Sequence, residues 1–165
     1  MKSRYMLLVG VALTITAAPA AAIAQQATTT FPVSATVLKA CSVTASALNF
    51  GSYDPTAAAG LEGMTNLRVL CTVGTSYTIG LSPGTSAGAT VTSRKMINGE
   101  NTLNYELFQE AARTNNWGDT PGTNTPPATS AGTTARQHTV YGRIPAGQIV
   151  PAGAYTDTIT VSVNY

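Results

Sequence analysis

The end of the chain carries the pattern that most limits its fold. Residues 158–165 alternate polar side chains with apolar ones, and the apolar positions are Ile159, Val161, Val163 and Tyr165. A period of two is typical of a β-strand with one buried face. We therefore predict a strand over residues 155–165 that runs to the last residue. The unpaired edge of such a strand attracts other chains.

The first 24 residues read as a secretory signal peptide. Lys2 and Arg4 precede an apolar run over residues 6–15, and Ala22-Ile23-Ala24 has the A-x-A form of a cleavage site. The apolar run is too short for a good membrane anchor. We expect export of a mature chain that begins at Gln25 and does not insert into a membrane.

A second alternating run follows this leader. Its apolar members are Phe31, Val33, Ala35 and Val37. Both ends of the mature chain thus have the pattern of strands whose pairing partners need explaining. The sequence therefore favours a role in the assembly of several chains over a catalytic role.

Charge and composition argue against several classes of partner. Two of the nine Lys and Arg residues lie in the leader, which leaves seven against seven Asp and Glu. A mature chain near neutrality, with scattered basic residues, has no electrostatic footprint for nucleic acid. His138 is the single histidine and no carboxylate cluster accompanies it, so we expect neither a metal nor another cofactor.

Two cysteines, Cys41 and Cys71, follow the leader. In an oxidising compartment such a pair is predicted to form one disulfide. Two unpaired buried thiols are the alternative, which is disfavoured outside the cytosol.

Alternating segments recur between turns rich in Gly, Pro, Asp and Asn. The predicted strands cover residues 29–38, 41–50, 66–73, 77–81, 89–97, 103–109, 138–144 and 155–165. Several short strands so spaced indicate an antiparallel sandwich or barrel. Asn98-Gly99 predicts a hairpin with a type I′ turn. Residues 114–136 are predicted to be one long surface loop.

Two segments match the G-x-S-x-G pattern of hydrolases, around Ser82 and Ser86. Pro83 has no N–H to offer an oxyanion hole, and the second segment precedes a strand-like run where a hydrolase needs a helix. Asp119 and His138 follow in a suitable order, but this reading ranks last. Simpler roles are expected for three other residues: Trp117 packs on its own domain or a neighbouring subunit, His138 lies at a strand edge, and Arg113 pairs with a carboxylate or carbonyl.

An ordered set of short motifs resembles the spore coat protein U domain family, which includes subunits of archaic chaperone–usher pili such as the Csu pili. The motifs are Cys41-Ser42-Val43, Leu48-Asn49-Phe50-Gly51, Tyr105-Glu106-Leu107-Phe108, Ala111-Ala112-Arg113-Thr114, Trp117-Gly118-Asp119, Tyr141-Gly142-Arg143-Ile144-Pro145 and Gly153-Ala154-Tyr155-Thr156-Asp157. The resemblance runs from about Phe31 to Tyr165, and the ordered spacing makes it specific.

The resemblance implies an all-β fold: an incomplete immunoglobulin-like antiparallel β-sandwich completed by a donor strand from another subunit. Residues 25–40 would be an N-terminal extension with the donor strand, and residues 41–165 the sandwich domain. Phe31, Val33, Ala35 and Val37 would be the donor side chains, and Cys41 and Cys71 the family disulfide. Pro32 has no N–H for a ladder, so the start of the donor strand stays open.

The implied partners are identical or related pilin subunits, a periplasmic chaperone and an outer-membrane usher. The C-terminal strand with Ile159, Val161, Val163 and Tyr165 would face the chaperone. The predicted function is that of a structural pilus subunit, without enzymatic activity, that supports adhesion and biofilm formation at the cell surface. The alternative is a secreted monomeric β-sandwich module that binds carbohydrate or surfaces.

Overall fold

The computed structural model of the protein describes residues 23–165. Most of the predicted leader, residues 1–22, therefore lies outside the described residues. The chain divides into two units, residues 1–35 and 36–165. Residues 23–40 contain no strand, and their side chains are exposed. No helix within residues 23–165 is long and apolar enough to cross a membrane.

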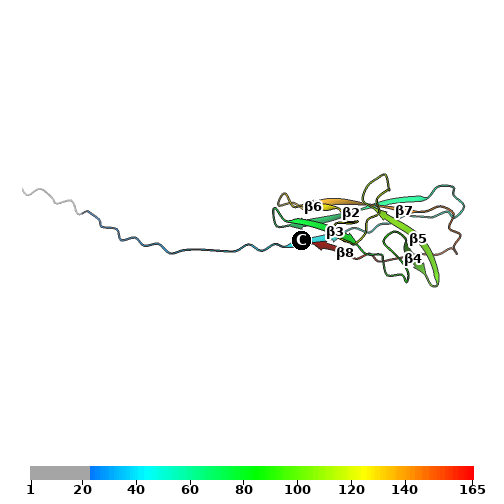
Figure 1. Ribbon diagram of the computed structural model, residues 1–165, viewed down its shortest axis with the longest axis horizontal. Helices are drawn as coiled ribbons and strands as arrows, with labels where there is room; N and C mark the ends of the chain where they lie inside the picture. The colour runs from blue at the N-terminus through cyan, green and yellow to red at the C-terminus, as the bar shows by residue number, and fades with distance from the viewer. Residues whose placement is uncertain (1–22) are drawn as a thin grey trace, which may run out of the picture. The chain divides into compact units, whose positions relative to one another are not determined.

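Eight antiparallel strands form two sheets in the second unit (Figure 1). In chain order they are β1 (Cys41–Ala45), β2 (Leu61–Cys71), β3 (Ser76–Leu81), β4 (Arg94–Asn98), β5 (Asn101–Phe108), β6 (Pro127–Thr129), β7 (Arg136–Ile144) and β8 (Val161–Asn164). The larger sheet has the order β1-β2-β7-β5-β4, and the smaller has the order β6-β3-β8.

One apolar core holds these sheets together. Its buried side chains come from alternate positions of the larger sheet, such as Val69, Leu103 and Val140, and from β3, where Ile79 is completely buried. The period-two burial matches the alternation in the sequence, because successive side chains of a strand point to opposite faces. The predicted all-β antiparallel architecture is confirmed.

Several predicted strands are shorter in the structure. The strand expected over residues 89–97 begins only at Arg94, because Thr90 and Ser93 exchange two backbone hydrogen bonds of 3.1 Å in a tight turn. The strand expected over residues 41–50 ends at Ala45. Ser46 still hydrogen-bonds to Asn66 and Thr65 of β2, and the side chains of Leu48 and Phe50 then lie over the larger sheet. Residues 29–38 contain no strand.

The predicted hairpin is present, but its turn is shifted by one residue and its turn type differs. Asn98 pairs with Asn101, which makes Gly99 and Glu100 the two turn residues. Of these two, only Gly99 has a positive φ, 60°. A glycine at the first central position and a negative φ at the second are typical of a type II′ turn, whereas type I′ needs positive φ at both.

The prediction of one long surface loop over residues 114–136 is wrong. Trp117 is 1% exposed, and its indole Nε1 donates a hydrogen bond of 2.8 Å to the Ile79 carbonyl. Thr125 and Ser130 are also buried, and β6 in the same segment pairs with β3. The Thr-, Gly- and Pro-rich composition hid this packing, because β6 has only three residues and few apolar side chains.

Candidate functional site

Two sheet edges face each other on one side of the sandwich. β1 is the last strand of the larger sheet, β8 is the last strand of the smaller sheet, and the two strands lie in contact. Within the described residues β1 pairs only with β2, and β8 pairs only with β3. Each strand therefore has one row of backbone N–H and C=O groups without a ladder partner, which is the template that another strand needs.

An apolar groove of about 970 Å³ begins where these edges end, since it touches β1 at Ala45 and β8 at Val161. One side is residues 46–52, which we call the N-terminal rim, and the other is residues 155–160, the C-terminal rim. Core side chains line it, among them Leu81, Leu103, Leu107, Val140 and Ile144. The groove thus opens into the interior between the two sheets.

Apolar side chains along the groove pack on the core but are not fully covered. Leu48 and Phe50 are half-buried in the N-terminal rim, and Tyr155, Ile159 and Val161 are half-buried on the β8 side. Core residues of this kind are usually buried in soluble proteins. The pattern is what a sandwich shows when one strand is missing between two of its edges.

A pair of glycines lets the N-terminal rim lie close to the larger sheet. Gly63 of β2 and Gly142 of β7 are directly paired, and the Leu48 and Phe50 side chains lie over them. A Cβ atom added to Gly142 would meet the Phe50 ring at 2.6 Å and Leu48 at 2.8 Å. Only glycine therefore leaves room for this crossing.

The C-terminal strand is shorter than the predicted residues 155–165, since β8 covers only Val161–Asn164. Its inward positions are nevertheless those expected: Ile159, Val161 and Val163 are half-buried, and the intervening residues are exposed. Tyr165, at 57% exposed, is not covered by its own domain.

The predicted donor side chains are exposed to solvent. Phe31, Val33 and Val37 are 81%, 84% and 82% exposed, and Ala35 is exposed as well. Soluble proteins seldom expose a row of large apolar side chains without a binding purpose. Their two-residue spacing would place all of them on one face of an extended strand.

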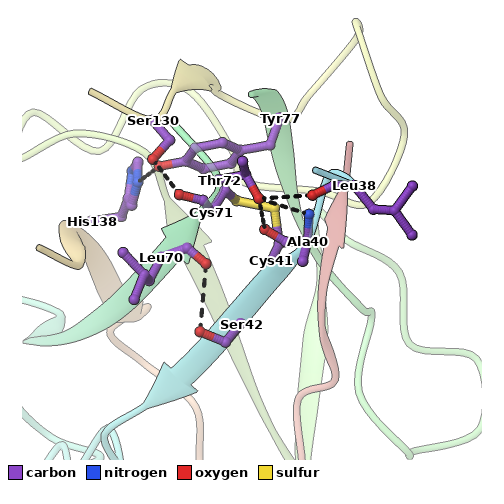
Figure 2. The surroundings of a disulfide bond; sticks show 10 residues. All are labelled: Leu38, Ala40, Cys41, Ser42, Leu70, Cys71, Thr72, Tyr77, Ser130 and His138. Atoms are coloured by element: carbon purple, nitrogen blue, oxygen red, sulfur yellow. Dashed lines mark hydrogen bonds between the residues drawn. A yellow bond between two sulfur atoms is a disulfide. The ribbon is translucent and has the colours of Figure 1, made fainter. Parts of the chain in front are cut away.

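The predicted disulfide between Cys41 and Cys71 is present and joins β1 to β2 at the start of the domain (Figure 2). The Thr72 hydroxyl accepts a hydrogen bond of 3.1 Å from the Ala40 amide, and the Thr72 amide donates one of 2.9 Å to the Ala40 carbonyl. Ala40 thereby extends the pairing of β1 with β2 by one residue beyond the disulfide. The N-terminal extension is anchored where it joins the domain.

Sequence reasoning missed Arg94, which is 0% exposed. Its guanidinium donates to four carbonyl groups, those of Leu81, Ser82, Val91 and Trp117, at 2.7–2.9 Å. Burial lowers the pKa of Arg94 to about 10. No pattern in the sequence signals this role, because an arginine at a strand start is ordinarily exposed.

The candidate catalytic residues serve as structural groups. Ser82 Oγ accepts hydrogen bonds from the Gly84 and Thr160 amides, and Ser86 Oγ donates to the Lys95 carbonyl. His138 lies in β7 and its Nε2 is 3.0 Å from the Tyr77 hydroxyl of the opposite sheet. These partners do not form a Ser–His–Asp relay.

The simpler expectation for Arg113 is confirmed. Its guanidinium forms an ion pair of 2.9 Å with Glu62 and donates to the Gly142 carbonyl. Trp117 packs into its own domain, as described above, which is one of the two positions expected for it.

Comparisons with known proteins agree with this geometry. The model of the Spore Coat Protein U domain family matches residues 27–162. Protein U of Myxococcus xanthus is 36% identical in an alignment 157 residues long, gaps included, and the alignment covers 86% of this chain and 87% of that protein. The structure of the CsuC–CsuE chaperone–tip adhesion subunit pre-assembly complex from the archaic chaperone–usher Csu pili of Acinetobacter baumannii matches with a TM-score of 0.58 and 28% identity. That match covers 79% of this chain and 40% of the other chain, and it agrees with an immunoglobulin-like sandwich.

Proposed function

The chain belongs to the Spore Coat Protein U domain family, and we propose that it is a structural subunit of a surface pilus or fibre assembled by the chaperone–usher route. The observation that carries this proposal is the apolar groove between the N-terminal and C-terminal rims, which continues from the unpaired edges of β1 and β8. An inserted strand would gain ladder hydrogen bonds on its backbone and apolar contacts on one face. The solved relative named above was captured with its chaperone.

The inserted strand in the finished fibre is the N-terminal extension of the next subunit. Phe31, Val33, Ala35 and Val37 carry the apolar face that the groove requires. Burial of the three large side chains contributes about 1.5–3 kcal/mol each, before the cost of ordering the strand is subtracted. Backbone pairing adds to this sum, so a slowly dissociating contact between subunits is expected.

Before assembly a periplasmic chaperone fills the groove and faces the C-terminal strand at Ile159, Val161, Val163 and Tyr165. An outer-membrane usher then exchanges it for the donor strand of an identical or related subunit. The resulting fibre lies at the cell surface, where it supports adhesion and biofilm formation. We propose a structural role and no enzymatic one for the subunit.

Replacing Val33 by Asp tests the donor role. A carboxylate in an apolar groove costs several kcal/mol, so heat-resistant multimers should disappear from gels while the soluble subunit–chaperone complex persists. Ser34→Asp is the matched control, because its side chain would point away from the groove. If the Val33→Asp subunit itself fails to accumulate, the extension belongs to a self-sufficient fold, and a secreted monomeric binding module becomes the better function.

A further inference from the structure

The C-terminal rim of the groove is held with few ladder bonds of its own. Residues 155–160 precede β8, and their backbone hydrogen bonds to other elements are few. Thr156 exchanges two bonds with Ile97, at 2.9 and 3.1 Å, and the Thr160 carbonyl accepts one of 3.0 Å from the Ser82 amide. Side chains therefore have to supply much of the constraint on this segment.

Asp157 provides the first constraint. Its Oδ2 accepts a hydrogen bond of 2.8 Å from the Tyr105 hydroxyl, and its Oδ1 accepts bonds from the Thr85 amide and hydroxyl at 2.9 and 3.0 Å. Oδ1 also accepts from the Thr158 amide at 2.7 Å. One carboxylate thus ties the rim to β5 and to the loop after β3.

A second constraint on the C-terminal rim comes from the segment Gly80-Leu81-Ser82-Pro83-Gly84. Ser82 Oγ accepts a hydrogen bond of 2.9 Å from the Thr160 amide of the rim. Gly84 lies against the Asp157 carboxylate with a φ of 98°, and the carboxylate occupies the space that a Cβ atom would need. The pattern that resembled a hydrolase motif is therefore shaped to receive the rim.

We infer that Asp157 and Ser82 are positioning residues that hold the C-terminal rim in place, so that the groove is formed before a partner strand enters it. This inference rests on the proposed function for its purpose, although the contacts themselves do not depend on it. A preformed rim reduces the ordering cost of binding. Loss of either residue should leave the sandwich folded and weaken the groove as a binding site.

The test uses the mature chain purified with its chaperone and a synthetic peptide of residues 28–40 as the donor. Asp157→Ala and Ser82→Ala should each raise the apparent Kd for the peptide about tenfold, which corresponds to one lost hydrogen-bonded contact. Hydrogen–deuterium exchange should become faster in residues 155–163 and stay unchanged in β2 and β7. Asp119→Ala, which alters an exposed carboxylate without a side-chain hydrogen bond, is the control.

The outcomes separate the two proposals. Wild-type affinity together with wild-type exchange in both variants would overturn the positioning role. If even the wild-type subunit takes up no peptide, the donor-strand function fails, and the exchange measurement still decides whether Asp157 and Ser82 hold the rim. Tyr105→Phe removes only the hydroxyl that binds Asp157, so it gives the same test without a cavity if Asp157→Ala does not accumulate.

Discussion

At the scale of single residues, Arg94 shows how one buried charged side chain can join several backbone segments by hydrogen bonds. A guanidinium has five N–H donors in a fixed plane, and here it satisfies carbonyls of β3, of the turn before β4 and of the Trp117 loop. The bonds to the Leu81 and Trp117 carbonyls lie in the buried interior of the domain. Arg94 therefore links β3, the turn before β4 and the loop at Trp117.

Replacing Arg94 by Met should destabilise the domain by at least about 3 kcal/mol, because four carbonyls lose their donor at once. Arg94→Lys should recover only part of the loss, since one ammonium cannot reach all four acceptors. Urea unfolding of the mature chain measures the difference. Arg68→Met, at an exposed position of β2, is the control and should change little; equal effects of the two would refute the linking role.

His138 makes stability depend on pH. Burial, and then the charge of Arg136, lower its pKa below 6.5. Below pH 6.5 the unfolded chain binds a proton that the folded chain resists, so stability is present above this pH and falls as the pH drops towards the folded pKa.

The matching experiment compares the urea midpoints of wild type and His138→Gln between about pH 7.5 and pH 5. The wild type should lose more stability over this range than the variant, because carboxylates titrate alike in both. Parallel losses would show that His138 carries no such linkage.

At the scale of elements, the segment from Thr114 to Arg136 behaves as structure rather than as a loop. Gln109 Nε2 donates to the Asn124 carbonyl at 3.0 Å, and Ser130 Oγ donates to the Cys71 carbonyl at 2.8 Å. β6 also pairs with β3, on the side opposite β8.

Deleting residues 123–133 should therefore abolish accumulation of the subunit in the periplasm, because β3 loses a neighbour and buried Thr125 and Ser130 are removed. Immunoblots of periplasmic extracts give the readout. Thr133→Asp, an exposed change in the same segment, should leave the amount unchanged. Normal accumulation of the deletion variant would mean that this packing is dispensable.

Strands with a strong alternation of polar and apolar residues can be predicted from the sequence. Segments that are held by side-chain hydrogen bonds, and not by pairing with a neighbouring strand, cannot. The period-two alternation in the sequence predicted β2, β3, β5, β7 and the inward face of β8. The short β6, with its polar composition, has no such signal. The C-terminal rim was assigned to one long strand, because an alternating pattern does not reveal that Asp157 and Ser82, rather than a neighbouring strand, hold it.

At the scale of the whole molecule, the groove could be anticipated only through family resemblance. No local pattern in the sequence shows that a strand is missing between β1 and β8. These two strands lie at opposite ends of the domain sequence, so no short segment contains both. The exposed donor side chains and the half-buried groove residues belong to one proposed contact. The extension that carries the donor side chains joins the domain at the hydrogen bond between Ala40 and Thr72.

One donor strand and one groove per subunit give the proposed fibre a direction. A Val33→Asp subunit keeps its groove but cannot donate, so it should enter a wild-type fibre only at the end where no strand is donated. When tagged Val33→Asp subunits are coexpressed with wild type, immunogold electron microscopy should show label at one end of each fibre.

Tagged Ser34→Asp subunits should label the fibre along its whole length, because their donor face is intact. Label along the length with Val33→Asp would mean that subunits join through a surface other than the groove. The same images would then exclude donor-strand exchange as the contact that builds the fibre, since a carboxylate at the centre of the donor face cannot be accommodated in an apolar groove without a large loss of affinity.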